Sequence, residues 1–405
     1  MHPRQLLLQV FQAALDAVNG RERVRAFLKT QPPAPPVYLV ALGKAACPMA
    51  LGALDALRAG IRDALVVTKR GYAERLPWPV LEAAHPVPDA SSLEAGKRLL
   101  EFVAAVPRAA PVLVLLSGGA SALVEQLPPG AGLETLRRMN QWLLASGRDI
   151  AAMNRVRKRL SLIKGGRLAQ PLAPRPVTCL AISDVPEDDP RFIGSGPLVP
   201  DETAAQEPVD DAPEDVRAAL RNASALPRAD DPCFARVRFE IIARLADAKH
   251  AAAGAARAHG LQARLHAEFL TGDAPAAGAH TALAVLDSPP GVLHVWGGET
   301  TISLPARPGR GGRNQTLALS AARALCGREN VLLLAAGTDG SDGPTADAGA
   351  LVDGATIERG EAEYGSAQAA LARADAGSFL EASGDLIRTG PTGTNVMDLV
   401  LGLRY

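Results

Sequence analysis

The sequence of 405 residues predicts an α/β protein in which buried strands alternate with amphipathic helices. Short runs of Val, Leu, Ile and Ala have the length of buried strands, and amphipathic segments separate most of them. Hydrophobic residues make up 47% of the chain, which is enough for sizeable cores. Apolar strands joined through helices are typical of parallel sheets that are covered on both faces.

The elements follow one another along the whole chain. The predicted strands are 37–42, 64–68, 112–116, 177–182, 239–242, 292–296 and 331–335. The predicted helices between them include 91–106, 133–145, 246–259 and 314–326. Apolar residues at helical spacing also predict an N-terminal helix that ends at Gly20.

Residues 197–234 differ from the rest because they are acidic, rich in Pro and Ala, and poor in strand signals. One short helix is predicted within them, at 213–221. A chain of this length suggests two or three domains. We therefore place a boundary near residue 235, which predicts an N-terminal α/β domain of residues 1–235 and a C-terminal one of residues 236–405.

Composition argues against several functional classes. Lys and Arg number 43, as do Asp and Glu, so no nucleic-acid binder is indicated. The four cysteines form no C-x-x-C pair, which argues against a zinc ribbon or a disulfide framework. No uncharged apolar run approaches the ~18 residues of a membrane span. The expectation is a soluble, cytoplasmic protein with reduced thiols and no membrane partner.

The ends of the predicted strands are rich in glycine and polar residues. The segments are LVALGKAA, LVVTKRGYA, LVLLSGGASALV, CLAISDVPEDD, LHVWGGETTI and LLLAAGTDGSDGPTADAGA. Glycines let backbone N–H groups approach a phosphate, and hydroxyl groups add donors. One such segment can be an ordinary turn. Their recurrence predicts a ligand site beyond the carboxyl ends of the strands.

Two cations stand where helices begin. Lys44 follows a predicted strand and Gly43, and it is either a solvated lysine or the partner of an anion. Arg313 lies in the Gly-rich segment GRGGRNQ, where a cation opposes the helix dipole unless an anionic ligand compensates. The segment NRVRKRLSLIKGGR (residues 154–167) contains six cations, and most of its arginines are expected to form a solvated helix face.

Acidic residues also follow strands, notably Asp184, Glu299 and Asp339. Carboxylates near phosphate oxygens suit a magnesium–nucleotide complex, although Asp184 and Asp339 can equally cap helices or shape turns. No Walker A motif and no G-x-G-x-x-G is present. His85 is either a base or a structural residue, and Ser121 does not fit a G-x-S-x-G elbow.

Taken together, the motifs resemble those of the glycerate 2-kinase family, the MOFRL-type glycerate kinases. The segments are ALGKAA, AAHPVPDASS, LLSGGASAL, NRVRKRLSLIKGGRLA, SDVPEDDPRFIGSGP, WGGETTISL, GRGGRNQTLAL, AGTDGSDGPTADAGA and TGPTGTNVMDL. The resemblance implies two Rossmann-like α/β domains with the active site in the cleft between them. It also implies that ATP phosphorylates the 2-hydroxyl of D-glycerate with Mg²⁺ as the metal cofactor.

By this resemblance, the family's essential lysine matches Lys44 and its essential arginine matches Arg313. The candidate substrate- and phosphate-binding residues are Ser117, Gly118, Gly119, Ser121, Lys69, Asn154, Gly297, Gly298, Glu299, Gly337, Thr338 and Asp339. The candidate metal ligands are Asp184 and Asp339. The sequence departs from relatives at Arg159, where they commonly have His, and after Ile242, where a family asparagine is absent.

Two alternatives remain open at this point. One is a hydroxypyruvate reductase that uses a nicotinamide cofactor, a name that some family members carry, although the dinucleotide fingerprint is missing. The other is a non-catalytic module that binds glycerate or sugar phosphates. The sequence does not choose between a monomer and a homodimer, and it leaves the acceptance of related hydroxy acids open.

Overall fold

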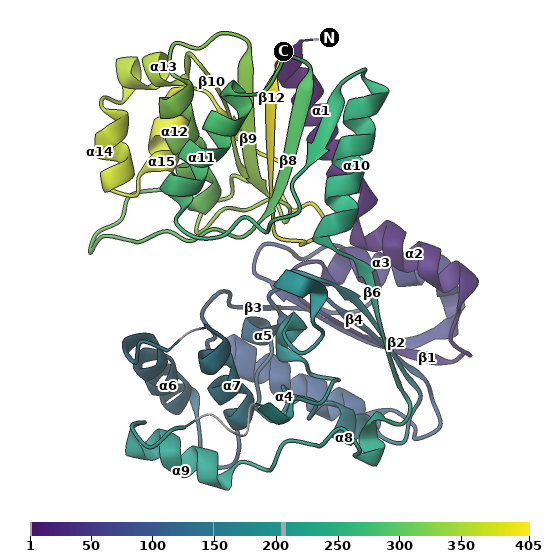
Figure 1. Cartoon of the computed structure of the whole chain (residues 1–405). Helices are drawn as coiled ribbons and strands as arrows, with labels where there is room; N and C mark the ends of the chain where they lie inside the picture. Colours follow the sequence, from purple (N-terminus) through teal and green to yellow (C-terminus); the bar gives the residue numbers. More distant parts are fainter. Residues whose placement is uncertain (1, 149, 204–207) are drawn as a thin grey trace. The chain divides into compact units, whose positions relative to one another are not determined.

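The computed structural model describes residues 2–148, 150–203 and 208–405, and the chain forms two compact α/β units. One comprises residues 20–242 and is called the Lys44 unit. The other combines the chain up to residue 19 with residues 243–405 and is called the Arg313 unit. Each contains a six-stranded sheet flanked by helices (Figure 1). The predicted α/β class is confirmed.

The sheet of the Lys44 unit has the strand order β3-β2-β1-β4-β5-β6. Its strands are β1 (Val37–Leu42), β2 (Ile61–Lys69), β3 (Val80–Ala83), β4 (Val112–Leu116), β5 (Val177–Ile182) and β6 (Val237–Ala243). The pairs β3/β2, β2/β1, β1/β4 and β4/β5 are all parallel, as the apolar runs predict. Strand 37–42 and strands 112–116 and 177–182 have the predicted bounds.

Helices cover both faces of this sheet. They are α2 (Gly20–Thr30), α3 (Ala46–Leu57), α4 (Ala90–Ala105), α5 (Ala120–Leu123), α6 (Leu133–Ala145), α7 (Ile150–Leu160), α8 (Ala169–Leu172) and α9 (Glu214–Asn222). Short 3₁₀ turns are η1 (Arg58–Gly60), η2 (Pro186–Asp188), η3 (Ile193–Ser195) and η5 (Pro232–Phe234). Val40 and Leu42 of β1 share a core with Leu99 and Val103 of α4, so the alternate residues of β1 face the other side.

The sheet of the Arg313 unit has the order β11-β10-β9-β12-β8-β7 and is mixed. Its strands are β7 (Gln262–Leu265), β8 (Val292–Gly298), β9 (Val331–Gly337), β10 (Gly349–Asp353), β11 (Leu386–Ile387) and β12 (Asp398–Arg404). Strand β12 runs antiparallel between β8 and β9. The expectation of a parallel sheet is therefore wrong here, because a strand buried on both faces has the same apolar pattern in either direction.

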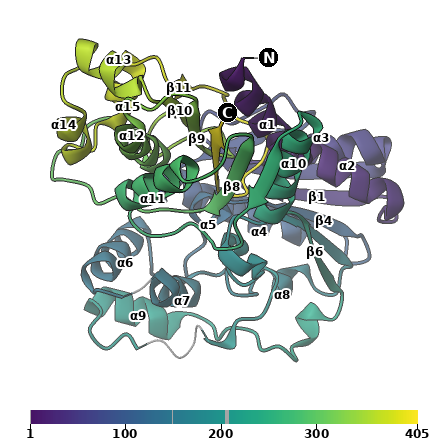
Figure 2. The ribbon, with the colours of Figure 1, turned by 45° about the horizontal axis from the view of Figure 1, so that its top comes forward.

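Helices α1 (Pro3–Ala17) and α10 (Leu245–Ala258) lie on one face of this sheet (Figures 1 and 2). The other face carries α11 (Ala274–Leu286), α12 (Arg313–Leu325), α13 (Thr356–Glu363), α14 (Ala367–Ala372) and α15 (Ala376–Ala382). Helices α11 and α12 approach closely at Gly278, where a Cβ would lie 2.2 Å from the Leu317 carbonyl oxygen. No helix in the described part of the chain has the length and apolar character needed to cross a bilayer.

The division of the chain differs from the boundary placed at residue 235. The two units separate at the end of β6, between Ile242 and Ala243. Residues up to Asn19 belong with the C-terminal residues, because α1 packs against α10 rather than within the Lys44 unit. Sequence position alone does not reveal this, since the apolar face of an amphipathic helix does not identify its partner.

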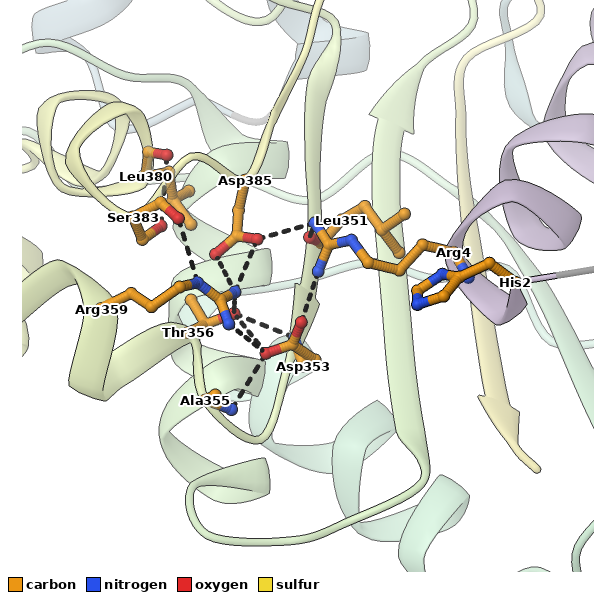
Figure 3. Close-up of polar contacts among 10 residues, drawn as sticks. All are labelled: His2, Arg4, Leu351, Asp353, Ala355, Thr356, Arg359, Leu380, Ser383 and Asp385. Atoms are coloured by element: carbon orange, nitrogen blue, oxygen red, sulfur yellow. Dashed lines mark hydrogen bonds and ion pairs between the residues drawn. The ribbon is translucent and has the colours of Figure 1, made fainter.

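A cluster of four charged side chains fastens α1 to the Arg313 unit (Figure 3). Arg4 Nη1 lies 2.5 Å from Asp353 Oδ2, and Arg4 Nη2 donates to Asp385 Oδ1 and to the Leu351 carbonyl oxygen, each at 2.7 Å. Arg359 binds the same two carboxylates, at 3.0 Å from Asp353 and 2.8 Å from Asp385. Because the Asp385 side chain is only 1% exposed, this cluster is screened from water and contributes more than a surface ion pair.

We predict that Arg4→Ala destabilises the Arg313 unit by about 1–3 kcal/mol, since buried Asp385 loses one of its two guanidinium partners. Denaturant unfolding measures the loss, and hydrogen exchange should show it in β10. Arg21→Ala is the matched control, because Arg21 pairs bidentately with Asp55 at the surface of the Lys44 unit. That variant should lose less than about 1 kcal/mol. Equal losses for the two variants would contradict the prediction.

Candidate functional site

The strand order of the Lys44 unit reverses between β1 and β4. From β1 the chain proceeds outward to β2 and β3, and it then returns to place β4 on the other side of β1. The carboxyl ends of these two parallel strands are level, with Leu42 paired to Leu116. In open α/β sheets, a reversal of this kind leaves room between two diverging loops, and ligands bind there.

Lys44 lies at this reversal, and the loop after β4 holds its backbone. The Lys44 N–H donates to the Gly118 carbonyl oxygen at 2.9 Å, and the next N–H, of Ala45, donates to Ser117 Oγ at 3.0 Å. Ser117 is buried, so its hydroxyl fixes the start of α3. The sequence-predicted residues Lys44, Ser117, Gly118 and Gly119 are therefore brought together by two neighbouring strand ends.

Gly119 provides the close approach that this arrangement needs. Its φ of 84° lies in the left-handed region that glycine adopts readily. A Cβ at this position would lie 3.2 Å from Lys44 Cγ, and 3.1 and 3.3 Å from His85 Cδ2 and Nε2. The structure thus places the His85 ring beside Lys44 and Gly119. A lysine and an imidazole side by side suit an anionic ligand more than an apolar one.

Ser121 meets a residue that the sequence analysis did not single out. Its Oγ lies 2.8 Å from Ser195 Oγ. Ser195 has φ 64°, which is uncommon for a residue other than glycine, and it stands between Gly194 and Gly196 in the quoted segment IGSGP. A serine between two glycines beyond a strand was the available signal. The hydroxyl pair joins this segment to the loop after β4.

The other candidates of the Lys44 unit lie on separate elements. Lys69 ends β2, and its Nζ lies 4.7 Å from the centre of the Tyr72 ring. Asn154 lies on α7, where its Oδ1 accepts a hydrogen bond of 3.1 Å from Arg157 Nη1. Asp184 follows β5 and is half-buried. The assignment of these three positions to the same ligand site as Lys44 stays a prediction.

Among the arginines of residues 154–167, most of which were expected to form a solvated face, none is fully exposed. Lys158, Lys164 and Arg167 are buried, and the other three cations are half-buried. Lys158 Nζ lies 2.5 Å from Asp201 Oδ2, and Lys164 Nζ lies 2.5 Å from Glu125 Oε2. Burial is possible because each lysine has a carboxylate partner.

Arg167 is buried in a different way, at the C-terminal end of α7. Its Nη1 donates to the carbonyl oxygens of Lys158 and Ser161, each at 2.6 Å, and its Nη2 donates to that of Arg159 at 3.3 Å. These carbonyl groups carry the negative end of the helix dipole, which partly balances the charge. The guanidinium therefore supports the fold, and its role is structural.

In the Arg313 unit, the Gly-rich segments meet where the central strands end. Strands β8 and β9 have their carboxyl ends there, and β12 begins between them. Asp398, the first residue of β12, pairs with Gly298 on one side and with Gly337 on the other. The segments 297–299 and 337–339 are thereby brought to the two sides of a single buried carboxylate.

Arg313 reaches this carboxylate from the first turn of α12. Its Nε and Nη2 donate to Asp398 Oδ2 and Oδ1 at 2.6 and 3.2 Å, and its Nη1 lies 2.5 Å from Glu299 Oε1. Burial alone would lower the pKa of Arg313, but Asp398, Glu299 and Asp342 outweigh it and hold that pKa above its ordinary value. The guanidinium is therefore permanently charged.

The start of α12 is occupied by another carboxylate, that of Asp342. Its Oδ1 and Oδ2 accept the N–H groups of Asn314 and Gln315 at 3.1 and 2.8 Å. Gly312 permits this approach, since a Cβ there would lie 2.3 Å from Asp342 Cγ. The sequence analysis expected an anionic ligand to balance Arg313 at this helix start. Side chains of the protein supply that negative charge.

Burial raises the pKa of Asp342 to about 7, and the neighbouring Asp398 adds to the rise. The two backbone N–H groups and the Arg313 guanidinium act in the opposite direction but do not cancel it. Asp342 is 2% exposed. Its protonation therefore changes near neutral pH, close to the guanidinium that the sequence analysis proposes as catalytic.

Thr338 and Asp339 have well-defined roles in the loop after β9. The Thr338 hydroxyl donates to the Met397 carbonyl oxygen at 2.6 Å and accepts the Val396 N–H at 2.8 Å. Asp339 Oδ1 accepts the Ser341 N–H at 2.9 Å. Both contacts order the turn, and they do not exclude a ligand at the remaining carboxylate oxygen.

Among the residues that the structure describes, no group of three or more His, Cys, Asp or Glu side chains is arranged to hold a metal ion. Asp184 and Asp339 belong to different units. Mg²⁺ is usually bound through one or two carboxylates together with substrate phosphates and water, so this donor set fits a metal that arrives with a nucleotide.

The structure thus gathers the candidates into two groups, one at the end of β1 and β4 and one at the ends of β8 and β9. Asp398 was missed from the sequence although it lies in the quoted segment TGPTGTNVMDL. The available signal was an acid at the start of an apolar run, DLVLGL. Asp342 was not singled out either, because nothing in a sequence tells which acid caps a distant helix.

Comparison with known proteins gives consistent results. The domain of unknown function DUF4147 matches residues 6–221, and the MOFRL family matches residues 292–398. A D-glycerate 2-kinase of Thermotoga maritima is 38% identical, covering 91% of this chain and 90% of that protein. A glycerate 2-kinase of Pyrococcus horikoshii is 36% identical, with 91% and 87% coverage.

Two further similarities complete the comparison. A protein of Agrobacterium vitis that is provisionally named a hydroxypyruvate reductase is 38% identical, covering 98% of this chain and 93% of its own. The crystal structure of a glycerate kinase from Thermotoga maritima superposes with a TM-score of 0.86 at 36% identity, covering 99% of both chains.

We predict that Gly119→Ala lowers activity at the Lys44 site at least ~10-fold, because a methyl group would press on Lys44 and His85. Gly130→Ala is the matched control. Gly130 has the same φ of 84°, but a Cβ there would have no atom within 4 Å. Both variants should lose about 1 kcal/mol of stability through backbone strain. Comparable activity in the two variants would show that crowding at Gly119 is harmless.

The Asp342 carboxyl should make the protein less stable as pH rises. An unfolded aspartate titrates near 3.8, whereas the folded group titrates at about 7, so between these values the folded chain holds an additional proton. The Asp342→Asn variant lacks this titration. The unfolding free energy of the variant minus that of wild type should therefore rise by up to about 1.4 kcal/mol per pH unit between about pH 4.5 and 6.5. A loss of stability from weaker hydrogen bonds between residue 342 and the start of α12 would be the same at every pH, so it does not affect this slope.

Asp353→Asn is the control for the Asp342 slope. Despite its burial, Arg359 and Arg4 lower the pKa of Asp353, so this group stabilises the fold above its unfolded pKa. Below the unfolded pKa near 3.8, Asp353→Asn should lose stability relative to wild type as pH rises, and between about pH 4.5 and 6.5 it should show no slope. Denaturant unfolding at several pH values measures both slopes, and equal slopes would contradict the assignment.

Proposed function

Because the chain belongs to the glycerate kinase family, we propose that it transfers the γ-phosphoryl group of ATP to the 2-hydroxyl of D-glycerate. The observation that carries this proposal is the 38% identity to a D-glycerate 2-kinase over 91% of the chain. The resemblance inferred from the motifs is confirmed by both family models. The products are 2-phosphoglycerate and ADP.

In this proposal both units are Rossmann-like and the active site is the cleft between them. For the Lys44 unit, the strand order β3-β2-β1-β4-β5-β6 supports the first part, since doubly wound nucleotide-binding sheets have this order. The DUF4147 match ends at residue 221 and the MOFRL match begins at residue 292. We therefore assign the glycerate kinase domain to the N-terminal part and the MOFRL domain to the C-terminal part.

Lys44 neutralises negative charge on the reacting groups. Phosphoryl transfer requires chiefly positioning and charge stabilisation, and a compact ammonium at the reversal of a parallel sheet suits both. The glycerate carboxylate or the transferred phosphoryl group is the partner of Lys44. Ser117 and Gly118 accept the backbone N–H groups of Ala45 and Lys44, Gly119 leaves room for the Lys44 side chain, and Ser121 adds a hydroxyl in the same loop.

Arg313 stabilises the equatorial oxygens of the phosphoryl group in the transition state. The glycerate 2-hydroxyl oxygen forms a bond to the γ-phosphorus while the bond from phosphorus to the bridging oxygen of ADP breaks. The hydroxyl proton leaves to solvent or to a nearby base, and His85 stands beside Lys44 to accept it. Glu299 and the segments 297–298 and 337–339 surround the Arg313 guanidinium.

Mg²⁺ bound with the nucleotide would neutralise phosphate charge, and Asp184 and Asp339 are the residues that would hold it. Neither carboxylate lies in a three-ligand group within the described chain, which supports a metal shared with ATP. The remaining interactions at both sites come from side chains and backbone groups of the protein.

We predict that Lys44→Ala lowers kcat/KM about 10²–10³-fold, since it removes a charge from the reacting centre. A ³¹P NMR time course with Mg-ATP and D-glycerate measures 2-phosphoglycerate directly. Lys97→Ala is the control, because Lys97 is 63% exposed on α4. It should retain wild-type activity.

The same assay separates the alternatives. Formation of 3-phosphoglycerate would retain the kinase but contradict the assigned position of attack. Oxidation of NADH by hydroxypyruvate, without any phosphorylated product, would favour the reductase. Binding of glycerate without turnover in either assay would favour the non-catalytic module.

A further inference from the structure

We propose that Asp398 is the positioning residue that sets the orientation of the Arg313 guanidinium for phosphoryl transfer. The inference rests on the proposed function for its effect on rate, whereas the orientation itself is a property of the Arg313 unit alone. Asp398 does not act on substrate in this account. It acts through Arg313.

The backbone of Asp398 is held more firmly than that of a loop residue. It begins β12, the central strand, and it is paired on both sides, with Gly298 of β8 and Gly337 of β9. The side chain is 8% exposed. The sheet consequently fixes the backbone from which the carboxylate extends.

The contact with Arg313 defines an orientation as well as a distance. Asp398 accepts two hydrogen bonds, one from Nε and one from Nη2, which lie on one edge of the planar guanidinium. Two parallel hydrogen bonds fix the plane and direction of the group, which a single ion pair does not. The guanidinium edge that contains Nη1 then faces away from Asp398.

Glu299 occupies that second edge in a different manner. It forms an ion pair with Nη1 at 2.5 Å, and its side chain is 44% exposed. Ion pairs of solvent-exposed carboxylates contribute little free energy. Phosphoryl oxygens bind arginine with the same geometry as a carboxylate, so an incoming phosphoryl group can replace Glu299 while Asp398 stays bound.

The first test is spectroscopic and does not depend on catalysis. In ¹⁵N-edited NMR, the Arg313 Nε–H signal is identified by its absence from Arg313→Ala. It should be sharp and protected from exchange in wild type, and it should broaden or exchange at least ~10-fold faster in Asp398→Asn, because the charged partner is lost. An unchanged signal would overturn the proposal, whether or not the protein is a kinase.

Asp353→Asn is the matched control for this comparison. Asp353 also pairs with arginines of the Arg313 unit, but it lies opposite Leu332, at the other end of β9 from Gly337. The Asp353→Asn variant therefore shows the effect of a loss of stability without a change at the Arg313 guanidinium. The Arg313 signal and the turnover rate should stay within about 2-fold of wild type in this variant.

Kinetics give the second test. Asp398→Asn should lower kcat about 10–100-fold with a much smaller change in KM, since orientation matters most in the transition state.

Chemical rescue gives a third test. Guanidinium ion should partly restore activity to Arg313→Ala, and it should not do so in the Arg313→Ala/Asp398→Asn double variant. Equal rescue in the two, or a kcat within about 3-fold of wild type in Asp398→Asn, would overturn the role in catalysis. Wild type without kinase activity would contradict the proposed function, and the NMR result would still decide the orientation.

Discussion

Burial of the central strands on both faces is the constraint on which the rest of this structure depends. Every residue of β4, β8 and β9 is buried, so these strands leave no position for a polar group that must meet water or a ligand. Polar chemistry is therefore displaced to the strand ends. Lys44, Ser117, Glu299 and Asp339 all occur within a few residues of a strand that has just ended.

The same constraint explains why charged side chains near the cores are paired with other groups of the protein. A charge near such a core must find a partner in the protein, because desolvation without one is expensive. Arg313 forms an ion pair with Asp398, and Lys158 forms one with Asp201. Arg167 donates hydrogen bonds to the carbonyl groups at the end of α7. These partnerships look alike in a sequence. They differ in accessibility, since the Arg313 side chain is 33% exposed, whereas that of Lys158 is 1% exposed.

The sequence predicted the elements of regular structure closely. Strand 112–116 and helix 133–145 have the predicted bounds, and the helix predicted at 314–326 is shifted by one residue. Periodicity and glycine positions are local properties, which is why they suffice for such elements. Strands β3, β7, β10 and β11 were not predicted; β3 and β7 are largely not buried, so they lack a continuous apolar run. Strand β12 was read only as part of a motif.

The residues of the candidate site also fall into those that the sequence indicated and those that only the structure showed. Residue types, their places after strands and the motifs they share with the glycerate kinase family can all be read along the chain, and Lys44 and Arg313 were found by these signals. Pairing between distant segments is different, because it depends on strand order and direction. Only the tertiary structure placed Asp398 between Gly298 and Gly337, Asp342 at the start of α12, and α1 with the C-terminal unit. Each of these contacts joins residues far apart in the chain, and the folding of buried surfaces decides which of them meet.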